Sequence, residues 1–304
     1  MISYIPQKVY YEKEVLQYNQ GLEIYNRYKN MGIPTKEILK HHKIEELRQL
    51  PDKEFTKLKK YLILGIRKSL RLIPNDKSAD FIVPFTSSGC MAMCSYCYLV
   101  CTFFTSSYLR IYVNREQMLE AIKRKIKKEG THKVYELGSN SDMVLENAIT
   151  GNLKWAIEEF GKLDNATATF ATKFSMVDSL LNAKHNGNTQ IRISVNPRDI
   201  IKKVEIGTSD FNERIEAANK MFNAGYKVGI NIAPIILVGD WKTNYTELIK
   251  ELYNKVNKKM HDKTFFELIF MTYGYANDTI NKAAMPNIYN VFKKEIMRPK
   301  GRGK

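Results

Sequence analysis

The sequence predicts an α/β fold, a partial (β/α)6 barrel of the TIM type with a helix-rich N-terminal region and a short C-terminal extension. From residue 81 onward, six short apolar runs alternate with amphipathic helical patterns along the 304-residue chain. Parallel strands need helical crossovers of this kind, so the alternation predicts a parallel sheet. Six units suit an open barrel better than the closed eight-fold form. The chain is long enough to bury a substantial core.

The boundaries of these elements follow from the same pattern. The candidate strands cover residues 81–86, 133–137, 167–172, 190–195, 227–233 and 264–269. Helical patterns lie between them, near 115–128, 150–161, 175–184, 211–224 and 243–258. Two helix starts have the signature of a capping box, Asn114 with Gln117 and Asp210 with Glu213, and Gly225 is typical of a helix end.

The composition divides the chain into three parts. Residues 1–80 are rich in lysine and helical in pattern, and Pro34, Pro51 and Pro74 interrupt them. Residues 81–270 carry the alternating pattern of the barrel, and residues 271–304 form a C-terminal segment. We therefore expect an N-terminal region that covers the barrel, followed by the barrel itself and an extension.

The net charge is strongly positive, because 48 Lys and Arg residues against 32 Asp and Glu residues give +16. Such an excess attracts phosphate backbones and indicates nucleic acid as a partner, although lysines that only solvate helix faces are an alternative. No apolar run approaches the roughly 20 residues of a membrane-spanning helix, and the N-terminus lacks the pattern of a signal peptide. We expect a cytoplasmic monomer with reduced cysteines and no membrane partner.

Three of the four cysteines are closely spaced. Cys90, Cys94 and Cys97 form a C-x3-C-x2-C motif, and Cys101 is the remaining cysteine. Three thiolates in one short loop can bind three irons of a 4Fe–4S cluster and leave the fourth iron open. S-adenosylmethionine (SAM) can chelate that iron, and an electron from the cluster then breaks its sulfonium bond to give a deoxyadenosyl radical. Tyr96, the aromatic residue before the third cysteine, is a further mark of such radical SAM loops.

Two other interpretations of the cysteines compete with the cluster. A structural zinc site usually combines two C-x2-C pairs, or one pair with histidines, and here the fourth ligand would have to be Cys101 or a distant His. A disulfide framework is disfavoured, because four cysteines within twelve residues cannot crosslink a chain of this length. The zinc interpretation makes the chain a non-catalytic, zinc-stabilised nucleic-acid-binding protein, colourless where an iron–sulfur protein is brown.

Polar residues follow the predicted strands at their C-terminal ends, where barrel enzymes place their chemistry. The cysteine motif follows the first strand. Strand ends are also commonly polar for structural reasons alone. This alternative to a role in the active site is stronger for Ser194 than for Lys173. The residues at the ends of the second to fifth strands are Ser139, Ser141, Asp142, Lys173, Ser194, Asn196 and Ala233.

Beyond these patterns, the chain resembles the spore photoproduct lyases, radical SAM enzymes that repair a thymine dimer in spore DNA. The shared segments occur in order from about residue 8 to residue 270. The cysteine loop marks the radical SAM superfamily in general, whereas the Lys-His-Asn-Gly run at 184–187 and the Gly-Thr-Ser run at 207–209 point to this family. The other shared segments are 110–114, 141–142, 171–173, 178, 194–196, 214–218, 224–226 and 266–269.

This resemblance implies an enzyme, a carbon–carbon lyase with a 4Fe–4S cluster and SAM as cofactors. It would break the methylene bridge of the spore photoproduct in DNA and restore two thymines, with an electron from a reductant such as flavodoxin or ferredoxin. Cys90, Cys94 and Cys97 would hold the cluster. Tyr98 would stand beside the lesion and pass a radical back toward SAM, while Tyr96 and Tyr98 could instead shield the cluster. The residues implied in SAM binding are Ser141, Asp142, Lys173, Ser194, Asn196 and Ala233.

Some residues depart from the family pattern. Ser139 stands where the family has its hydrogen-donating cysteine, and an alcohol O–H bond is too strong for that role. Cys101 is a candidate substitute donor, with a spare buried thiol as the alternative. The change at Ser139 also leaves open a family member that acts on another nucleotide, RNA or a peptide. Residues 270–275 lack an expected His-Arg pair, and 298–304 resemble the start of a Gly-rich basic hairpin that contacts DNA in the family.

Overall fold

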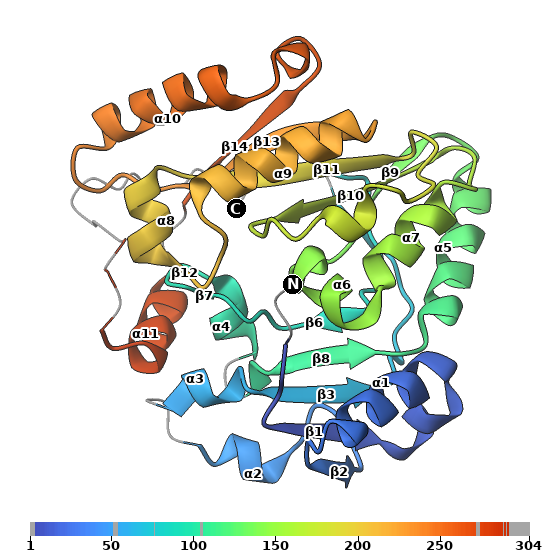
Figure 1. Cartoon of the computed structure of the whole chain (residues 1–304). Helices are drawn as coiled ribbons and strands as arrows, with labels where there is room; N and C mark the ends of the chain where they lie inside the picture. Colours follow the sequence, from blue (N-terminus) through green and yellow to red (C-terminus); the bar gives the residue numbers. More distant parts are fainter. Residues whose placement is uncertain are drawn as a thin grey trace.

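The computed structural model describes residues 4–50, 54–75, 77–103, 106–271, 274–287, 289 and 291. Two main sheets organise the chain, and they occupy the upper and lower halves of the view in Figure 1. Residues 272–273 of the segment predicted to lack a His-Arg pair lie outside the described residues, as does the predicted hairpin start at 298–304. No helix in the described ranges is long and apolar enough to cross a membrane.

The larger sheet has seven strands and forms the partial barrel. In chain order they are β4 (Ile73–Pro74), β5 (Phe81–Ile82), β9 (Lys133–Glu136), β10 (Ala166–Thr172), β11 (Thr189–Val195), β13 (Lys227–Ile235) and β14 (Phe265–Phe270). The last six are parallel neighbours in that same order, and β4 pairs antiparallel with β5 at the edge. These six parallel strands are the six that the sequence predicts, so the partial barrel is confirmed.

Helices connect the parallel strands, except between β10 and β11, and cover the outside of this sheet (Figure 1). The predicted helix at 175–184 is wrong, because only a 3-10 turn forms there, over Asp178–Leu180. The backbone N–H of Ser175 instead bonds the Ser209 hydroxyl of another loop, at 3.0 Å. The predicted helix at 150–161 is present over Asn152–Phe160, and Gly151, with φ of 68°, separates it from a further helix, Met143–Thr150, that was not predicted. The connecting helices are α5 (Arg115–Glu129), α6 (Met143–Thr150), α7 (Asn152–Phe160), α8 (Arg198–Val204), α9 (Phe211–Asn223) and α10 (Trp241–Lys255).

The first 80 residues contribute strands as well as helices. Their helices are α1 (Asn19–Asn30) and the single turns α2 (Glu45–Arg48) and α3 (Phe55–Leu58). Besides β4, their strands are β1 (Lys8–Glu12), β2 (Thr35–Ile38) and β3 (Tyr61–Gly65). These three join β6 (Ser87–Ser88) and β8 (Leu109–Tyr112) in a second sheet of order β2-β1-β3-β8-β6. This sheet crosses residue 80, and the division of the chain into three parts stays a prediction.

Each sheet has its own apolar core. In the smaller sheet, Val9, Leu62, Leu64 and Ile111 are buried against Ile24 of α1. The larger sheet buries its alternating apolar residues against α5, α7 and α9. Each fully buried aliphatic side chain contributes about 1.5–3 kcal/mol of transfer free energy, so both cores stabilise the fold.

The helix ends show which capping predictions hold. The capping box of α9 is confirmed, because Asp210 accepts from the Glu213 N–H and Glu213 accepts from the Asp210 N–H. Gly225, with φ of 91°, follows the end of this helix as predicted. The capping box at Asn114 does not form, because its side chain bonds no backbone N–H of the helix and instead exchanges two hydrogen bonds with the Arg67 backbone. The predicted pair does meet through its side chains, since the Asn114 amide donates to Gln117 at 2.8 Å.

Two contacts fix the cysteine segment between the sheets. β7 (Met93–Cys94) pairs antiparallel with β12 (Glu205–Ile206), which follows α8 far along the chain. The next helix, α4 (Tyr98–Phe103), packs against α11 (Tyr275–Ala284). The cysteine segment is therefore held by parts of the chain that come more than a hundred residues later.

Candidate functional site

The three predicted cluster cysteines lie in this segment. Cys94 belongs to β7 and is buried, with 7 % of its surface exposed, whereas Cys90 and Cys97 are half-buried. Cys94 stands opposite Glu205 in the β7–β12 pair. Asn281 of α11 donates to a backbone carbonyl of the loop at 2.8 Å. The positions of the cysteines are thus set by contacts on both sides of the loop.

The loop requires a glycine where it begins. Gly89 has a φ of 88°, and a Cβ atom there would lie 2.3 Å from the carbonyl oxygen of Tyr108. The Gly89 N–H donates to the Asn140 carbonyl at 2.9 Å. This bond joins the start of the cysteine loop to the loop after β9, which carries Ser139 and Ser141.

The donor set fits a 4Fe–4S cluster. Burial raises the pKa of the Cys90 thiol to about 12 and that of Cys94 well above its ordinary range, so thiolates form there only when a metal replaces the proton. Lys59 is buried, and its ammonium lies within electrostatic reach of all three cysteines. Among the described residues, no three His, Cys, Asp or Glu side chains are placed to share one metal ion. Cluster cysteines bind different irons, so they need not converge on one point.

Tyr98 and Ser139 are in direct contact. The Tyr98 hydroxyl donates to the Ser139 carbonyl, although Tyr98 begins α4 and Ser139 follows β9. Burial, together with the charges of Cys97 and Glu136, raises the pKa of Tyr98 to about 12, so the phenol keeps its hydrogen at neutral pH. The side chain is still 51 % exposed, which leaves its ring within reach of a ligand.

Ser141 and Asp142 differ in how many hydrogen bonds their side chains make within the protein. The Asp142 carboxylate caps α6 and also accepts from the Thr172 hydroxyl and the Lys173 N–H. These partners give Asp142 a structural role, and its predicted contact with SAM stays a prediction. The Ser141 hydroxyl has a hydroxyl partner at 2.5 Å, that of Ser87.

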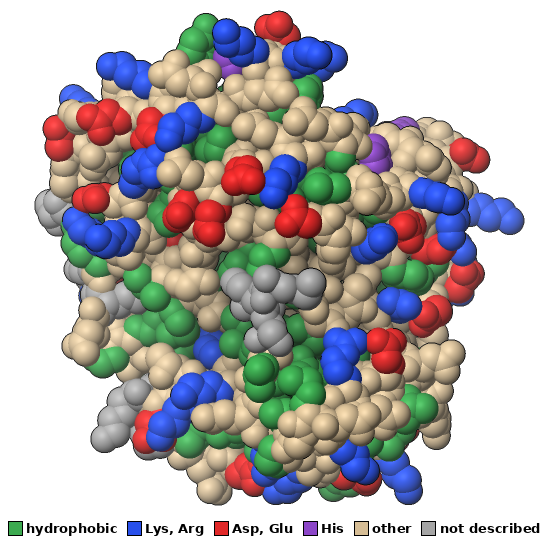
Figure 2. Space-filling view, viewed as in Figure 1, with side chains coloured by type: hydrophobic (Ala, Val, Ile, Leu, Met, Phe, Trp, Pro, Cys, Tyr) green, Lys and Arg blue, Asp and Glu red, His purple; other side chains and the backbone are tan. Residues whose placement is uncertain are grey.

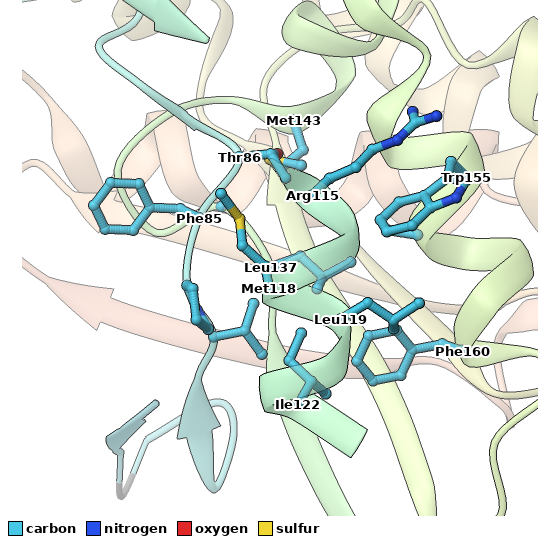
Figure 3. A pocket seen from close by; sticks show the side chains of 14 residues that line it. Phe85, Thr86, Arg115, Met118, Leu119, Ile122, Leu137, Met143, Trp155 and Phe160 are labelled. Carbon is cyan, nitrogen blue, oxygen red and sulfur yellow. The ribbon is translucent and has the colours of Figure 1, made fainter. Parts of the chain in front are cut away.

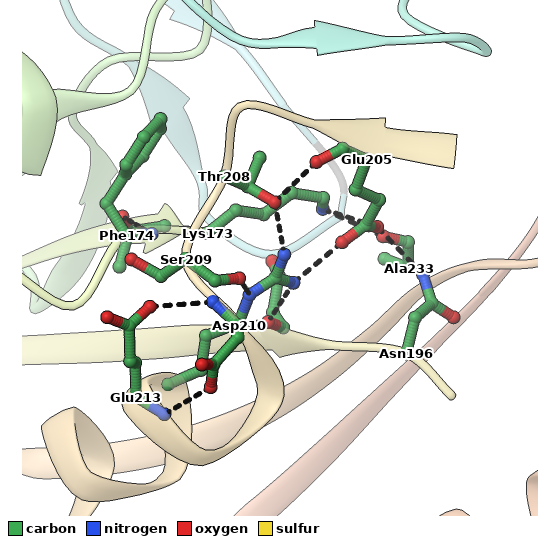
Figure 4. Close-up of polar contacts among 12 residues, drawn as sticks. Lys173, Phe174, Asn196, Glu205, Thr208, Ser209, Asp210, Glu213 and Ala233 are labelled. Atoms are coloured by element: carbon green, nitrogen blue, oxygen red, sulfur yellow. Dashed lines mark hydrogen bonds and ion pairs between the residues drawn. The ribbon is translucent and has the colours of Figure 1, made fainter. Parts of the chain in front are cut away.

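A polar network centred on Glu205 lies beside the cysteine loop (Figure 4). One carboxylate oxygen of Glu205 accepts from the Tyr96 hydroxyl at 2.5 Å and from the Asn196 amide at 2.9 Å. The Lys173 ammonium lies 3.7 Å from that same oxygen, and the buried Arg214 guanidinium lies 2.7 Å from the other one. Burial raises the pKa of Glu205, but the Lys173 and Arg214 charges outweigh it and hold that pKa below its ordinary value.

This network brings most of the predicted SAM residues together. The Lys173 ammonium donates to the Ala233 carbonyl at 3.0 Å, and Arg214 donates to the Ser194 carbonyl, also at 3.0 Å. With Asn196, these residues come from the C-terminal ends of β10, β11 and β13. Their gathering at one rim follows the prediction from strand ends, while their contact with SAM stays a prediction.

Sequence reasoning overlooked three charged residues of the site. Glu205, Arg214 and Lys59 are all buried, yet none was predicted to take part. The one available signal was a carboxylate between two apolar residues in the run Val-Glu-Ile at 204–206. Cys101, predicted as a substitute donor, lies on α4 one turn beyond Cys97 and is half-buried.

An apolar pocket between α5 and α7 is separate from this network (Figure 3). Met118, Leu119, Ile122 and Phe160 line it, and the Arg115 guanidinium lies 4.6 Å from the ring centre of Trp155 beside them. None of the predicted site residues lines this pocket, whose other walls come from residues 83–86 after β5 and from Leu137, Gly138 and Met143.

Comparisons with known proteins agree with this geometry. A family model described as spore photoproduct lyase matches residues 4–301. The spore photoproduct lyase of Bacillus subtilis (strain 168) is 38% identical over 271 residues, which cover 88% of this chain and 78% of that protein. The enzyme of the same name from Clostridium acetobutylicum is 34% identical over 268 residues, covering 86% of this chain and 77% of that protein.

Solved structures of spore photoproduct lyases share the fold. A double mutant with bound AdoMet and dinucleoside spore photoproduct has a TM-score of 0.93 at 32% identity, and the match covers 99% of this chain and 89% of that one. A complex with dinucleoside spore photoproduct has a TM-score of 0.88 at 33% identity, covering 94% of this chain and 84% of that one. The chain is therefore an enzyme that belongs to the spore photoproduct lyase family of the radical SAM superfamily.

Proposed function

We propose that this enzyme reverts the spore photoproduct in DNA to two thymines, with a 4Fe–4S cluster and SAM as cofactors. The observation that supports the proposal most directly is the Tyr98–Ser139 contact, which with the Gly89–Asn140 bond joins the cysteine segment to the loop after β9. The solved relatives with AdoMet and the dinucleoside photoproduct bound support it as well.

The residues of the chain have distinct roles in this proposal. Cys90, Cys94 and Cys97 would hold the cluster, and Lys173 would bind the carboxylate of SAM. The side chain of Lys173 is 19 % exposed, and a ligand carboxylate can compete for its ammonium with the neutral Ala233 carbonyl. When bound, these cofactors supply a deoxyadenosyl radical that takes a hydrogen atom from the dimer.

After the bridge breaks, the thymine radical needs a hydrogen atom, and Ser139 stands at the position proposed for the donor. Its own O–H bond is too strong to donate that atom. The Tyr98 phenol contacts Ser139 and keeps its hydrogen at neutral pH, so it is the donor at hand, and Cys101 lies on the same helix. We propose that repair by this chain is slow or gives side products, because no thiol stands at position 139.

The net positive charge of the chain would attract DNA to the enzyme. Figure 2 shows Lys and Arg side chains scattered over one face and interspersed with Asp and Glu, so the net charge of +16 is spread rather than gathered there. A charge excess of this kind attracts the backbone without reading sequence. Enzymes that act on a base in a duplex extrude it first, and the lesion would have to leave the stack to reach Tyr98.

The test is anaerobic reconstitution with iron and sulfide, followed by incubation with SAM, dithionite and dinucleoside spore photoproduct. Release of thymidine pairs from the dimer and formation of deoxyadenosine are followed separately. Both products are expected. Deoxyadenosine without loss of the dimer would favour the second candidate, a family member with another nucleotide, RNA or peptide as substrate, which the change at Ser139 motivates. A colourless protein that binds zinc and leaves SAM intact would refute both.

A further inference from the structure

A fully buried carboxylate lies beneath Ser141. Glu146 of α6 has 0 % of its surface exposed. Its Oε1 accepts from the Asn152 amide at 2.7 Å and from the Thr150 hydroxyl at 3.1 Å. Its Oε2 accepts from the hydroxyls of Ser87 at 2.8 Å and Thr86 at 3.1 Å. Burial raises the pKa of Glu146, and the four neutral donors around the carboxylate act against burial and favour its charged form.

Ser87 connects this carboxylate to Ser141. Its hydroxyl oxygen lies 2.8 Å from Glu146 Oε2 and 2.5 Å from the Ser141 hydroxyl oxygen. A serine has one hydroxyl hydrogen, and an ionised carboxylate can only accept, so the hydrogen of Ser87 points to Glu146. Two oxygens at 2.5 Å need a hydrogen between them, and Ser141 must supply it.

This order of donors leaves the Ser141 oxygen as an acceptor. The other partner of its hydroxyl is the Met143 sulfur at 3.8 Å, a weak acceptor and a much longer contact. With its hydrogen committed to Ser87, Ser141 can offer only lone pairs to a ligand. The lone pairs would repel a ligand carboxylate, whereas an N–H or O–H group of a ligand could donate a hydrogen bond to them.

We propose that Glu146 and Ser87 are positioning residues that orient the Ser141 hydroxyl, so that Ser141 accepts a hydrogen bond from a donor group of SAM. This inference rests on the proposed function only in placing SAM at Ser141. The donor is the ammonium group or a ribose hydroxyl of SAM, which leaves the carboxylate to Lys173. Neither Glu146 nor Ser87 has to touch the cofactor for this role.

The substitution Glu146→Gln reverses the order of donors with little change in shape. The Asn152 carbonyl oxygen accepts from Gln20 at 2.5 Å and from Arg115 at 3.0 Å, which fixes the Asn152 amide group toward Glu146. The oxygen of a glutamine at 146 must therefore face Asn152, and its NH2 group must face Ser87. Ser87 then donates to Ser141, and the Ser141 hydrogen is freed toward the ligand.

The experiment measures dissociation constants on the anaerobically reconstituted protein. Three probes are used: S-adenosylhomocysteine, its analogue without the amino group, and methylthioadenosine, which keeps only the nucleoside. For Glu146→Gln we expect about tenfold weaker binding of S-adenosylhomocysteine, because a donor then faces a donor. If the partner is the ammonium, the loss disappears with the analogue that lacks the amino group. If the partner is a ribose hydroxyl, the loss persists with methylthioadenosine.

Two further variants complete the test. Thr86→Val also removes a hydrogen bond to Glu146 but does not touch the Ser87–Ser141 contact, so it should bind all three probes like the wild type. Ser87→Ala should weaken binding about threefold, and the loss should depend on the amino group or the ribose of the probe in the same way as for Glu146→Gln. This variant tests the inference if Glu146→Gln does not fold. Wild-type affinity in folded Glu146→Gln, or in Ser87→Ala, overturns the inference. If the variants show these binding differences but the enzyme does not revert the dimer, only the proposed function is refuted. If the wild type binds none of the probes, the inference and the proposed function are both overturned.

Discussion

At the scale of single residues, position 139 has the largest expected effect on the reaction. Ser139→Cys places an S–H bond at the position that the proposal gives to the hydrogen donor, next to Tyr98. Because a thiol gives up its hydrogen atom far more readily than an alcohol, we expect faster and cleaner conversion of the dinucleoside photoproduct. The measurement is the ratio of restored thymine pairs to side products. The amount of deoxyadenosine formed gives the number of SAM molecules cleaved.

Controls for this prediction separate the possible donors. Cys101→Ala in the wild-type background should leave the product ratio unchanged, because Cys101 lies one helical turn away from the cluster loop. Tyr98→Phe should increase side products, because it removes the phenolic hydrogen while it keeps the ring. If Ser139→Cys changes nothing and Cys101→Ala abolishes turnover, Cys101 is the donor and the assignment to Tyr98 is wrong.

A second residue-scale prediction concerns pH. Glu136 of β9 pairs with Arg192 of β11, which also contacts Glu267 of β14 at 3.1 Å. Burial raises the pKa of Glu136 from 4.5 to about 7, despite the opposing charge of Arg192. Between these two pH values the folded state holds a proton that the unfolded state has lost, so the free energy of unfolding falls as pH rises. The fall from this group is roughly 3 kcal/mol and ends near pH 7.

The test compares wild type with Glu136→Gln in urea unfolding across that pH window. The variant keeps the shape of the side chain but cannot ionise, so its curve of unfolding free energy against pH should be flatter than that of the wild type. Glu116→Gln, at an exposed site on α5, is the matched control and should keep the wild-type slope. Parallel curves for wild type and Glu136→Gln would contradict the prediction.

At the scale of elements, the capping box of α9 gives a defined contribution to stability. Asp210 accepts from the Glu213 N–H at 2.9 Å, and Asp210→Ala removes this bond at the first turn. We expect the free energy of unfolding to fall by about 1 kcal/mol, the usual effect of losing an N-cap. Asp164→Ala, at an exposed turn, serves as the control and should shift the unfolding midpoint little. An equal shift in both variants would show that the cap is not the cause.

The elements also show what sequence could predict and what it could not. The six barrel strands could be predicted because each is a short apolar run, such as 227–233, and helical patterns separate most of these runs. β1 and β3 were missed, because each has only five residues and lies in a lysine-rich stretch that looks helical. The period of the sequence reports local burial, whereas these strands exist through pairing with each other and, for β3, with β8.

The site divides in the same way. The cysteines and Lys173 were predictable, because a motif or a strand end marks each of them in the sequence. Glu205 was not, because its importance comes from four partners that reach it only after folding, Tyr96, Lys173, Asn196 and Arg214. Charged residues buried by tertiary contacts leave little trace in a single sequence.

At the scale of the whole molecule, the two sheets should unfold together. The segment from β6 to β8 belongs to the smaller sheet but contains the cysteine loop, which pairs with β12 near the barrel. Leu64→Ala in β3 and Ile230→Ala in β13 each remove a buried side chain at a cost of about 2–5 kcal/mol. We expect a single urea transition that both variants shift to lower concentration, as followed by fluorescence and circular dichroism. Two transitions, each moved by one variant, would support separate N-terminal and barrel domains instead.

The net charge leads to the last prediction, on DNA binding. If the chain repairs a lesion in DNA, its charge of +16 should make affinity for a lesion-bearing oligonucleotide depend steeply on salt. Contacts to only two phosphates predict about a tenfold loss of affinity between 50 and 200 mM salt, and more contacts predict a larger loss. The dinucleoside photoproduct has no flanking phosphates, so its affinity should stay nearly constant and serves as the matched control. Fluorescence anisotropy measures the oligonucleotide, and calorimetry measures the dinucleoside. Equal salt dependence for the two ligands would mean that the net positive charge takes no part in holding DNA and that the lysines only solvate the helices.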